Sequence, residues 1–579
     1  MSVPTRENVL DTLRQNQTPQ VLIVGGGING IGLYRELALQ GIEVVLVERN
    51  DFCSGASTAL SRMIHGGLRY MENGEFQLVK ESLHERNNLL KNAPHYVAPL
   101  PTIVPIFSYS SGIWGAIRRF LRLSDKPTRR GAFIVKMGLT LYDLFTKSDQ
   151  VMPKHIFRNK ANTFKGWPAF HPDVKCSATY YDAWITYPER LGLEMINDVG
   201  QTNPNAIALN YMNVEGAEGK TVQVTDALTQ QSISITPDII VNATGAWVDF
   251  TNGALSASPD NKKTDIVGGT KGSHLVIRND DLLAATGGQM VYYENQEGRI
   301  CILFPYFGNV LVGSTDLKLD DPEGNKCEDF EREYILESLK FVFPKIEIAA
   351  SEILYSFSGV RPLPQSDSTV TGKISRDHYC KVVSKAEGFE TPVLCMIGGK
   401  WTTFRAFGEQ VADQILDMLE LKRNVSTKDL PIGGGRDFPR SKIGCDEWVN
   451  GLSVRSGLKA MRVKSLVERY GTIAERIIDF MQTGDDAPLA SLASYSKREI
   501  EYIILNEHIV TLSDILCRRT SIAISGDVSL TVINEILEIL ASLKQWTKDQ
   551  KQAELDNVLY RLSHFHNLTE DVLRQRGIT

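Results

Sequence analysis

The first clear pattern of apolar and polar positions lies near the start of the chain. An apolar run at 20–24 leads through the glycine turn GGGING into an amphipathic segment ending near Gly41, and a second apolar run covers 43–48. Short apolar runs bounded by glycine are typical of buried strands, and the segment between them has helical spacing. The pattern therefore predicts a strand–helix–strand unit.

Further along, strand-like and helical patterns alternate before a long helical region. The expected segments are a helix at 75–90, a break at the prolines of 94–105, strands at 232–242, a mixed sheet at 271–317, an apolar strand at 394–397, a helix at 403–421, a glycine linker at 430–437 and helices from about 441 to 579. This order predicts an α/β protein with a helical C-terminal region.

Length and composition narrow the class of protein. At 579 residues the chain exceeds one hydrophobic core, so two or three domains are expected. The net charge of -6 disfavours nucleic acid as a partner. No stretch of the sequence looks like a signal peptide or an apolar membrane span. The eight cysteines form no CxxC pair, so we expect no metal site, no disulfide framework and an intracellular protein.

The turn after the first strand has the spacing of a nucleotide-binding motif. Gly25, Gly27 and Gly30 form GxGxxG, in which backbone N–H groups can approach a pyrophosphate at a helix N-terminus. Glu48 ends the next strand, where a carboxylate can accept hydrogen bonds from ribose hydroxyls. A dinucleotide is the leading interpretation, and the alternative is a glycine turn that binds no ligand.

Two later segments favour FAD over NAD. The sequence VNATG at 241–245 follows an apolar strand and offers a second close approach of the backbone to an extended cofactor. The sequence GGK at 398–400 precedes a helix, whose N-terminal dipole suits a flavin carbonyl that gains negative charge on reduction. The sequence has no second GxGxxG that would mark a separate NAD domain.

A larger set of motifs occurs in a fixed order: VGGGINGIG, SRMIHGGLRY, VNATGAWV, KGSHLV, VGSTD, YSFSGVRPL, ISRD and GGKWTTFR. In this order they resemble the FAD-dependent glycerol-3-phosphate dehydrogenases, from about residue 21 to 407 and more faintly to 519. The resemblance implies an FAD-binding Rossmann-like domain (1–88, 175–264 and 357–428), an interleaved mixed-sheet domain that covers the substrate (89–174 and 265–356) and a C-terminal α-helical domain (436–579).

The same resemblance implies oxidation of sn-glycerol 3-phosphate to dihydroxyacetone phosphate on FAD, with electrons passed to a membrane quinone. It implies cofactor contacts from Gly25, Gly26, Gly27, Ile28, Asn29, Gly30, Glu48, Ser57, Thr58, His65, Gly66, Gly67, Ala243, Thr244, Gly245, Gly399, Lys400, Thr402 and Thr403. Three rivals stay open: an oxidase of the same scaffold that uses oxygen, a dehydrogenase of another polyol phosphate, and a non-catalytic flavin-binding redox sensor.

Two histidines lie in these motifs and are candidates for a catalytic base. Oxidising a secondary alcohol requires removal of a hydride and of the hydroxyl proton, and a neutral imidazole is a suitable base near neutral pH. In the resembling pattern His65 lies beside flavin-contacting glycines, so it is the first choice. His274, in KGSHLV, is the second and could orient the substrate hydroxyl. For each, the alternative is a purely structural histidine.

Cationic side chains in the motifs provide a site for a phosphate group, whose geometry arginine forks match. The resemblance places Arg361, Arg376 and Lys400 around the substrate and counts Arg361 among the catalytic residues. Arg69 and Tyr70 are further substrate contacts. The alternative is that some of these cations pair with carboxylates, and it applies most to Arg376, which an aspartate follows.

The chain departs from the family pattern in one loop. Family members often have W-x-D-D-A-R after a Tyr-Asp pair, whereas this chain has YYDAWITYPERL. Thr186, Tyr187, Pro188 and Glu189 replace the acidic cluster, and Arg190 remains. The departure keeps the dehydrogenase of a longer polyol phosphate open as an alternative.

The segment 113–136 combines seven basic residues and one acid with aromatic and aliphatic side chains. This composition suits an element lying in the interface of an anionic membrane, and the alternative is a solvated basic face. Because a quinone is dissolved in the membrane, we expect a cytoplasmic protein attached peripherally to the inner face of the cell membrane. A homodimer is compatible with the sequence.

Overall fold

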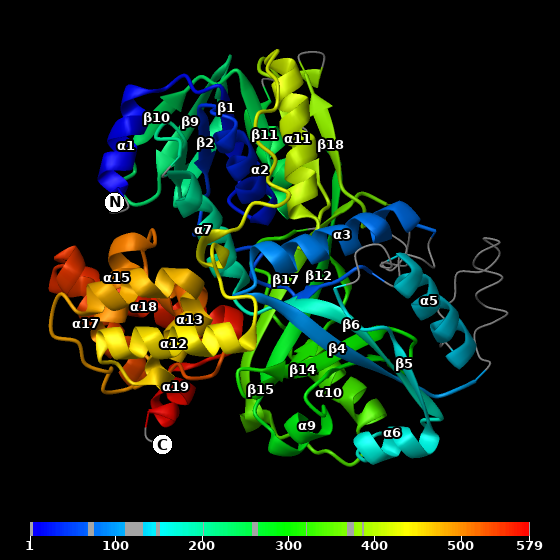
Figure 1. Cartoon of the computed structure of the whole chain (residues 1–579). Helices are drawn as coiled ribbons and strands as arrows, with labels where there is room; N and C mark the ends of the chain where they lie inside the picture. The colour runs from blue at the N-terminus through cyan, green and yellow to red at the C-terminus, as the bar shows by residue number, and fades with distance from the viewer. Residues whose placement is uncertain are drawn as a thin grey trace.

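The computed structural model describes residues 4–67, 74–109, 131–145, 151–200, 202–256, 264–319, 321–366, 376–384 and 387–577. Its three parts are a Rossmann-like part around a six-stranded sheet, a part around a ten-stranded sheet and a helical C-terminal part (Figure 1). This mixed α/β architecture with C-terminal helices confirms the predicted fold class.

The six-stranded sheet contains the predicted strand–helix–strand unit. Its order is β18-β19-β11-β1-β2-β7, and it is parallel except at the β18 edge. The strands are β1 (Val21–Val24), β2 (Val44–Val47), β7 (Ile207–Leu209), β11 (Ile239–Asn242), β18 (Tyr379–Val383) and β19 (Val393–Ile397). Helix α2 (Ile28–Leu39) connects β1 to β2. Both faces of β1 are buried, which explains why it is a continuous apolar run.

Alternate residues of this sheet enter two different cores. Val21 and Ile23 pack with helices α2, α7 (Pro188–Gly200) and α11 (Phe404–Met418). Leu22 and Val24 pack on the other face, which is covered by α1 (Arg6–Gln15), α8 (Val248–Leu255) and a three-stranded sheet of β8 (Met212–Glu218), β9 (Thr221–Asp226) and β10 (Ser232–Ile235). The carboxyl ends of the parallel strands are thereby held in a rigid layer, where ligands of such sheets bind.

The second body is the mixed sheet, of order β16-β12-β15-β14-β13-β4-β6-β3, with β17 paired to β12 and β5 to β6. Its strands are β3 (Met63–Ile64), β4 (Val97–Ile106), β5 (Ile156–Asn159), β6 (Cys176–Ile185), β12 (Val267–Ile277), β13 (Met290–Glu294), β14 (Ile300–Tyr306), β15 (Asn309–Gly313), β16 (Leu317–Leu319) and β17 (Ile353–Pro364). The helices of this region are α3 (Phe76–Asn92), α5 (Ala132–Phe145), α6 (Lys160–Gly166), α9 (Asp280–Ala285) and α10 (Asp329–Val342).

The prolines that predicted a break at 94–105 lie instead within a regular strand. Pro99, Pro101 and Pro105 are all in β4, which pairs with β6 along its whole length. The three prolines occupy odd positions, so their missing N–H groups fall on one edge of the strand, and the alternate residues keep theirs. The prolines therefore remove hydrogen-bond donors along one side of the strand but do not end it.

The third body contains the helices α12 (Lys442–Ser456), α13 (Ala460–Tyr470), α14 (Ala474–Met481), α15 (Lys497–Asn506), α16 (Leu512–Asp514), α17 (Leu530–Lys544), α18 (Lys548–His566) and α19 (Glu570–Arg576). Its largest core also contains side chains of the mixed sheet, among them Phe304 and Phe357. The predicted glycine linker is packed against α7: Gly433 N–H donates to Asp198 and Gly434 N–H to Glu194. The helical part is thus docked on the other two bodies.

Candidate active site

A cavity of about 690 Å³ lies at the carboxyl ends of β1, β2 and β11 and reaches β17 of the mixed sheet. The predicted cofactor residues that line it are Gly25, Gly27, Ile28, Asn29, Glu48, Ser57, Thr58, Ala243, Thr244, Gly245, Gly399 and Lys400. Its volume is in the range of small-molecule and cofactor sites. The sequence therefore identified most of one wall of this cavity.

The glycine turn before α2 is required by close approach of the backbone. Gly25 has a φ of +110°, and a Cβ there would lie 2.7 Å from the carbonyl oxygen of Ala243. A Cβ on Gly30 would lie 2.0 Å from the carbonyl oxygen of Gly25. Helix α2 begins immediately after Gly27, so the positive end of its dipole points into the cavity, where an anion is stabilised.

Glu48 is held at the end of β2 by two backbone donors. Its carboxylate accepts hydrogen bonds from the N–H of Gly26 at 2.7 Å and the N–H of Asn50 at 2.8 Å. Burial raises the pKa of this carboxyl, although the two N–H groups lower it. The two donors fix a hydrogen-bond acceptor at the cavity wall in one orientation, as recognition of a ribose diol requires.

Two distant segments hold the start of α2 on the other side of the turn. The side-chain amide of Asn29 donates to the carbonyl of Gly398 at 3.1 Å, and a Cβ on Gly399 would lie 2.7 Å from that amide nitrogen. Ser57 Oγ accepts a hydrogen bond from the N–H of Ile28 at 2.9 Å, and its carbonyl accepts one from the indole of Trp401. These contacts therefore hold the glycine turn and the first turn of α2 in place on both sides.

His65 is not among the residues that line the cavity. Its N–H donates to Thr402 Oγ1 at 3.2 Å, and its side chain is half-buried. Burial first, and then the charges of Lys400, Arg376 and Arg86, lower the pKa of the imidazole to about 3. Because the lowered pKa leaves the ring neutral above about pH 3, its basic form is always available near pH 7.

The residues that follow His65 are fixed by a buried network. Gly66 N–H donates to Asp182 and to the hydroxyl of Tyr142, both at 3.2 Å. A Cβ on Gly66 would lie 2.4 Å from the side chain of Leu83, so side-chain packing requires this glycine. The remaining predicted cofactor residues of this region, Gly67, Thr402 and Thr403, are buried and do not line the cavity.

His274 is enclosed by packing and is only 1% exposed. Its ring stacks on Phe357 with centroids 5.0 Å apart, and its Nε2 atom is 2.8 Å from the hydroxyl of Ser61. Burial and then Arg361 lower the pKa of His274 to about 3. The two histidines differ in exposure, since His65 is half-buried and His274 is enclosed.

The cations predicted for a phosphate differ in their surroundings. Arg361 is a quarter exposed, and its guanidinium pairs with Asp316 at 3.1 Å and donates to Ser314 Oγ at 3.1 Å. Arg376 is half-buried, and its charge bears on His65. Lys400 is at the cavity wall, and burial lowers its pKa to about 7 even though Glu81, Asp182 and other carboxylates raise it.

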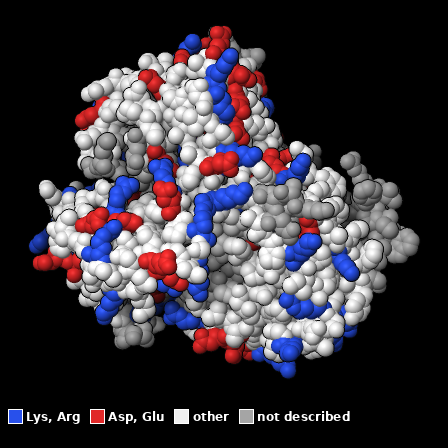
Figure 2. Space-filling view, viewed as in Figure 1, with Lys and Arg blue, Asp and Glu red and all other residues white. Residues whose placement is uncertain are grey.

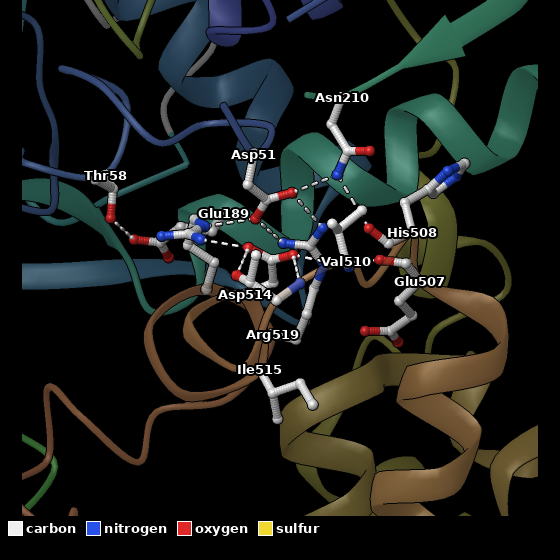
Figure 3. A network of polar contacts seen from close by, with 12 residues as sticks. Asp51, Thr58, Glu189, Asn210, Glu507, His508, Val510, Asp514, Ile515 and Arg519 are labelled. Atoms are coloured by element: carbon white, nitrogen blue, oxygen red, sulfur yellow. Dashed lines mark hydrogen bonds and ion pairs between the residues drawn. The ribbon is translucent and has the colours of Figure 1, made fainter. Parts of the chain in front are cut away.

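The loop that departs from the family pattern lies at a domain junction outside the cavity lining. Glu189 accepts a hydrogen bond from Thr58 at 2.6 Å, and Arg190 forms two hydrogen bonds with Glu507 at 2.9 and 2.8 Å. Figure 3 shows Glu189 between the Thr58 loop and the helical part. This loop therefore joins the cofactor loop to the C-terminal helices.

A second buried ion cluster fastens the same junction (Figure 3). Asp51 pairs with Arg518 at 2.5 Å and with Arg519 at 2.7 Å, and it accepts a hydrogen bond from Asn210 at 3.0 Å. Burial raises the pKa of Asp51, but Arg519 and Arg518 outweigh this and hold it well below its usual range. Both arginines belong to a π-helical turn, Ile515–Arg519.

The sequence missed two contributions to the cavity. The helical part lines it with Cys517, Arg518, Ile524, Arg561, Phe565 and His566. At the Glu48 end, the guanidinium of Arg49 lies 4.6 Å over the ring of Trp247, and Glu323 accepts hydrogen bonds from both side chains. Of these positions only Trp247 lies in one of the motifs, VNATGAWV, and none lies in GxGxxG.

Two predicted features lie outside the described residues. They are the substrate contacts Arg69 and Tyr70, and residues 113–130 of the segment predicted for the membrane.

Comparison with known proteins agrees with this geometry. Residues 20–413 match the family model of FAD dependent oxidoreductases, and residues 425–551 match that of the C-terminal domain of alpha-glycerophosphate oxidase. The chain is 30% identical to glycerol-3-phosphate dehydrogenase of Synechocystis sp., over 93% of this chain and 95% of that one. The chain belongs to the FAD-dependent glycerol-3-phosphate dehydrogenase family.

Two further relatives cover nearly the whole chain. The aerobic glycerol-3-phosphate dehydrogenase of Bacillus subtilis is 27% identical, over 95% of each chain. The crystal structure of the glycerol-3-phosphate dehydrogenase from Bacillus halodurans complexed with FAD has the same fold, with a TM-score of 0.73, 22% identity and coverage of 97% of this chain and 98% of that one.

FAD is the cofactor of this family, as predicted, and the residues of the cavity fit it. The glycines at 25 and 30 leave no room for a side chain where the backbone must approach a pyrophosphate, and Glu48 is oriented for a ribose. The alternative of a glycine turn that binds no ligand is excluded for this family.

Proposed function

We propose that the protein oxidises sn-glycerol 3-phosphate to dihydroxyacetone phosphate. The observation that carries this proposal is the position of His65, whose N–H donates to Thr402 Oγ1, two residues after Lys400 of the cavity wall. The charges of Lys400, Arg376 and Arg86 help to keep its imidazole neutral. An uncharged base inside a cationic environment is what a phosphorylated alcohol requires, because the phosphate needs cations and the hydroxyl needs a proton acceptor.

When bound, FAD supplies the acceptor for the hydride that leaves C2 of the substrate. The glycine turn and the N-terminus of α2 would hold its pyrophosphate, and Glu48 its ribose. His65 takes the proton of the C2 hydroxyl. Arg361 and Arg376 hold the phosphate, and His274 positions the cofactor loop through Ser61.

Lys400 has a role beyond the predicted contact with phosphate. A lysine whose pKa is lowered to about 7 is present partly as the free amine near neutral pH. A proton on this amine restores the ammonium ion, whose charge lowers the pKa of His65. Binding of a phosphate dianion favours the resulting ammonium ion.

The decisive experiment is anaerobic mixing of the purified yellow holoenzyme with glycerol 3-phosphate. We expect the flavin absorbance to bleach in a single turnover. FAD-loaded protein that stays yellow would contradict the proposal and favour the non-catalytic redox sensor. Longer polyol phosphates, such as erythritol phosphate, should bleach it more slowly, because the departed 186–190 loop ties domains together and does not line the cavity.

For the electron acceptor we propose a membrane quinone, with oxygen as the alternative acceptor. The matched B. subtilis relative is named aerobic, and a matched family model is named for an oxidase, so the names of relatives do not separate the two. The ratio of quinone reduced to peroxide formed, measured with the reduced enzyme, separates them directly. A peroxide yield close to one per substrate would overturn the quinone proposal.

We propose peripheral attachment to the inner face of the cell membrane, through 113–136 and helix α5, which begins within that segment. No helix among the described residues is long and apolar enough to cross a bilayer. Helix α5 lies at the edge of the molecule (Figure 1) and exposes Phe133 by 62%, Met137 by 52% and Leu144 by 60%. On the described surface shown in Figure 2, charges of both signs are interspersed. The exposed apolar side chains of α5 therefore support membrane attachment more strongly than the surface charge does.

Anionic vesicles test this attachment. Replacing Phe133, Met137 and Leu144 by serine should release the protein from vesicles, because the apolar face of an interfacial helix supplies most of its affinity. Neutralising Arg118, Arg119 and Arg122 should make binding weaker at physiological salt. Full binding of both variants would contradict this attachment.

The proposed domain division follows the cores of the molecule in part, because β3 and β6 lie in the ranges assigned to FAD but pair within the mixed sheet. We propose that 1–88, 175–264 and 357–428 bind FAD, that 89–174 and 265–356 cover the substrate, and that 436–579 form the helical domain. Support comes from separate cores around the six-stranded sheet, the mixed sheet and helices α12–α14.

A further inference from the structure

One fully buried carboxylate of the mixed-sheet part has no role in the reaction described above. Glu331 lies in the first turn of α10, and its side chain has no exposure to solvent. Ile335 and Leu339 of the same helix share a hydrophobic core with strands β12 and β15. Because residues four apart lie on one face of a helix, this packing turns Glu331 toward the same two strands.

Four donors converge on the carboxylate of Glu331. Its Oε1 accepts hydrogen bonds from Ser273 Oγ at 2.8 Å and from Thr315 Oγ1 at 2.7 Å. Its Oε2 pairs with Nζ of Lys271 at 2.7 Å and accepts a hydrogen bond from the N–H of Glu328 at 3.0 Å. A buried charge requires such partners, and hydrogen bonds to a charged group are the strong ones. Glu331 therefore fastens β12 to the loop that follows β15.

The loop that Glu331 fastens, residues 314–316 between β15 and β16, is also the one that holds Arg361. The guanidinium donates to Ser314 Oγ at 3.1 Å and to the carbonyl of Thr315 at 3.5 Å. It also pairs with Asp316 at 3.1 Å. Thr315 is thus bound from two sides, since its hydroxyl donates to Glu331 and its carbonyl accepts from Arg361.

The Arg361 guanidinium also rests on the backbone of β12. A Cβ at Gly272 would lie 2.1 Å from Nη2 of Arg361, so a side chain at this position would move the guanidinium. The Arg361 side chain is 25% exposed, which leaves part of it accessible to a ligand. An arginine has many rotamers, and holding it in one orientation before the ligand arrives removes that entropy cost from binding.

The arrangement accounts for two sequence motifs that the reaction leaves unexplained. In KGSHLV, Lys271 and Ser273 bind Glu331, and Gly272 leaves room for Arg361. In VGSTD, the last three residues contact Arg361, and the threonine also binds Glu331. Glu331 itself lies outside all the motifs, and its carboxylate is the point at which these two meet.

We propose that Glu331 is a positioning residue that orients the Arg361 guanidinium for the phosphate of the substrate. The proposal rests on the proposed function, in which Arg361 binds that phosphate. Glu331 is buried and does not line the cavity, so it acts through Thr315 and the 314–316 loop. It thereby strengthens the preference for a phosphorylated polyol over the free polyol, because an arginine fork recognises phosphate only in a suitable orientation.

Thr315→Val is the sharpest test, because it removes the hydroxyl that Glu331 binds and keeps the shape of the side chain. The readout is the ratio of kcat/KM for glycerol 3-phosphate to kcat/KM for glycerol, measured with the holoenzyme. We expect this ratio to fall by about 5-fold to 100-fold, mainly through a higher KM for glycerol 3-phosphate. Thr315→Ser, which keeps the hydroxyl, should restore the ratio. A merely structural defect would lower both activities alike.

Ser338→Ala is the matched control on the same helix. It also removes a buried hydroxyl, which contacts Tyr293 at 2.9 Å and donates to the carbonyl of Ile335 at 2.7 Å, away from the 314–316 loop. We expect the native ratio in this variant, whatever its thermal stability. An unchanged ratio in Thr315→Val, or an equal fall in Ser338→Ala, would overturn the proposal.

Calorimetric titration of the substrate-free holoenzyme with inorganic phosphate gives a readout that does not depend on turnover. Thr315→Val and Glu331→Gln should each bind phosphate about 5-fold to 100-fold more weakly than the native protein, and Ser338→Ala should bind it equally well. Native affinity in Thr315→Val would contradict the role of Glu331, even if Glu331→Gln fails to fold. Failure of glycerol 3-phosphate to bleach the native enzyme would instead contradict the proposed function, while the phosphate titration still reports on the orientation of Arg361.

Discussion

Two buried charge clusters, one around Asp51 and one around Lys400, lie beside the cofactor cavity. They differ in how completely neighbouring opposite charges compensate their own. In the Asp51 cluster one carboxylate is held by two arginines, and its pKa is well below the usual range. In the Lys400 cluster, Lys400 and Glu81 both have pKa values displaced to about 7. A carboxylate whose charge is fully compensated stays ionised near neutral pH, whereas a group whose charge is incompletely compensated can gain or lose a proton there.

This difference separates a structural cluster from a chemical one. The Asp51 cluster joins the loop after β2 to the π-helical turn of the C-terminal part, so its charges stabilise the assembly of domains. Lys400 of the other cluster has the largest effect among the charges that lower the pKa of His65, to about 3. Five predictions test this contrast, and they run from the largest expected effect to the smallest.

Replacing His65 by alanine should remove the base from the chemical cluster. We expect flavin reduction by glycerol 3-phosphate to slow by about 10² to 10⁴ fold, the usual contribution of general base catalysis, with FAD still bound. Anaerobic stopped-flow absorbance measures the rate. A loss below tenfold would transfer the role to His274, and His274→Ala is the matched comparison.

Replacing Asp51 by alanine should leave buried Arg519 without its carboxylate and Arg518 with Asp514 alone. We expect the free energy of unfolding to fall by about 3–5 kcal/mol, the usual cost of breaking a buried ion pair from one side. Urea unfolding of the holoenzyme measures the loss. The control is Asp11→Ala, whose carboxylate pairs with Arg14 at the surface and should cost less than about 1 kcal/mol.

The same cluster predicts the direction of acid sensitivity. Because the folded-state pKa of Asp51 lies below its unfolded value, the stability that this residue contributes is present above about pH 4 and is lost as pH falls toward the folded pKa. An Asp51→Asn variant should therefore lose part of the pH dependence of unfolding below about pH 4. An unchanged dependence would show that the arginines do not compensate this charge.

Replacing Glu48 by alanine tests the cofactor end of the cavity, where backbone N–H groups provide the compensation. The change removes a ribose acceptor and leaves the N–H groups of Gly26 and Asn50 without their partner. We expect FAD to bind about 5-fold to 100-fold more weakly, from the 1–3 kcal/mol cost of unsatisfied polar groups. Fluorescence titration of the apoprotein with FAD gives the dissociation constant, and unchanged affinity would remove Glu48 from the ribose site.

The smallest effect is on the pH profile of kcat/KM, which reports groups of the free enzyme. A lowered pKa of about 3 keeps His65 neutral above that pH, so His65 sets no limb near neutrality. The free amine of Lys400 is lost as pH falls below its pKa of about 7, so we expect an acid limb near 7. In Lys400→Met this limb should disappear from the residual activity. A native limb near pH 3 and none near 7 would show that His65, and not Lys400, sets the profile.

Local sequence predicted the elements whose cause is local. The run from β1 through α2 to β2 was confirmed because strand burial, helical spacing and the glycine turn all lie within neighbouring residues. The glycine turn and Glu48 were placed at the cavity for the same reason. The family motifs also identified His65 and Lys400, although motif order alone gave no protonation state.

Other features depended on residues far apart in the chain. The prolines of 94–105 suggested a break in the chain, yet three of them lie within the regular strand β4. The departed loop looked like a question of substrate specificity, but Arg190 meets Glu507 of the helical part. The pairing of Arg361 with Asp316 could not be predicted, since neither position carries a local signal for the other.

The sequence by itself determined the fold class, the family, the cofactor and the identity of most residues at one cavity wall. These follow from short-range periodicity, from glycine sterics and from motifs whose residues are close in the chain. Only the tertiary structure decided which charges are compensated and which wall of the cavity the C-terminal helices supply. Burial and ion pairing set those properties, and both depend on contacts between segments that the chain brings together only by folding.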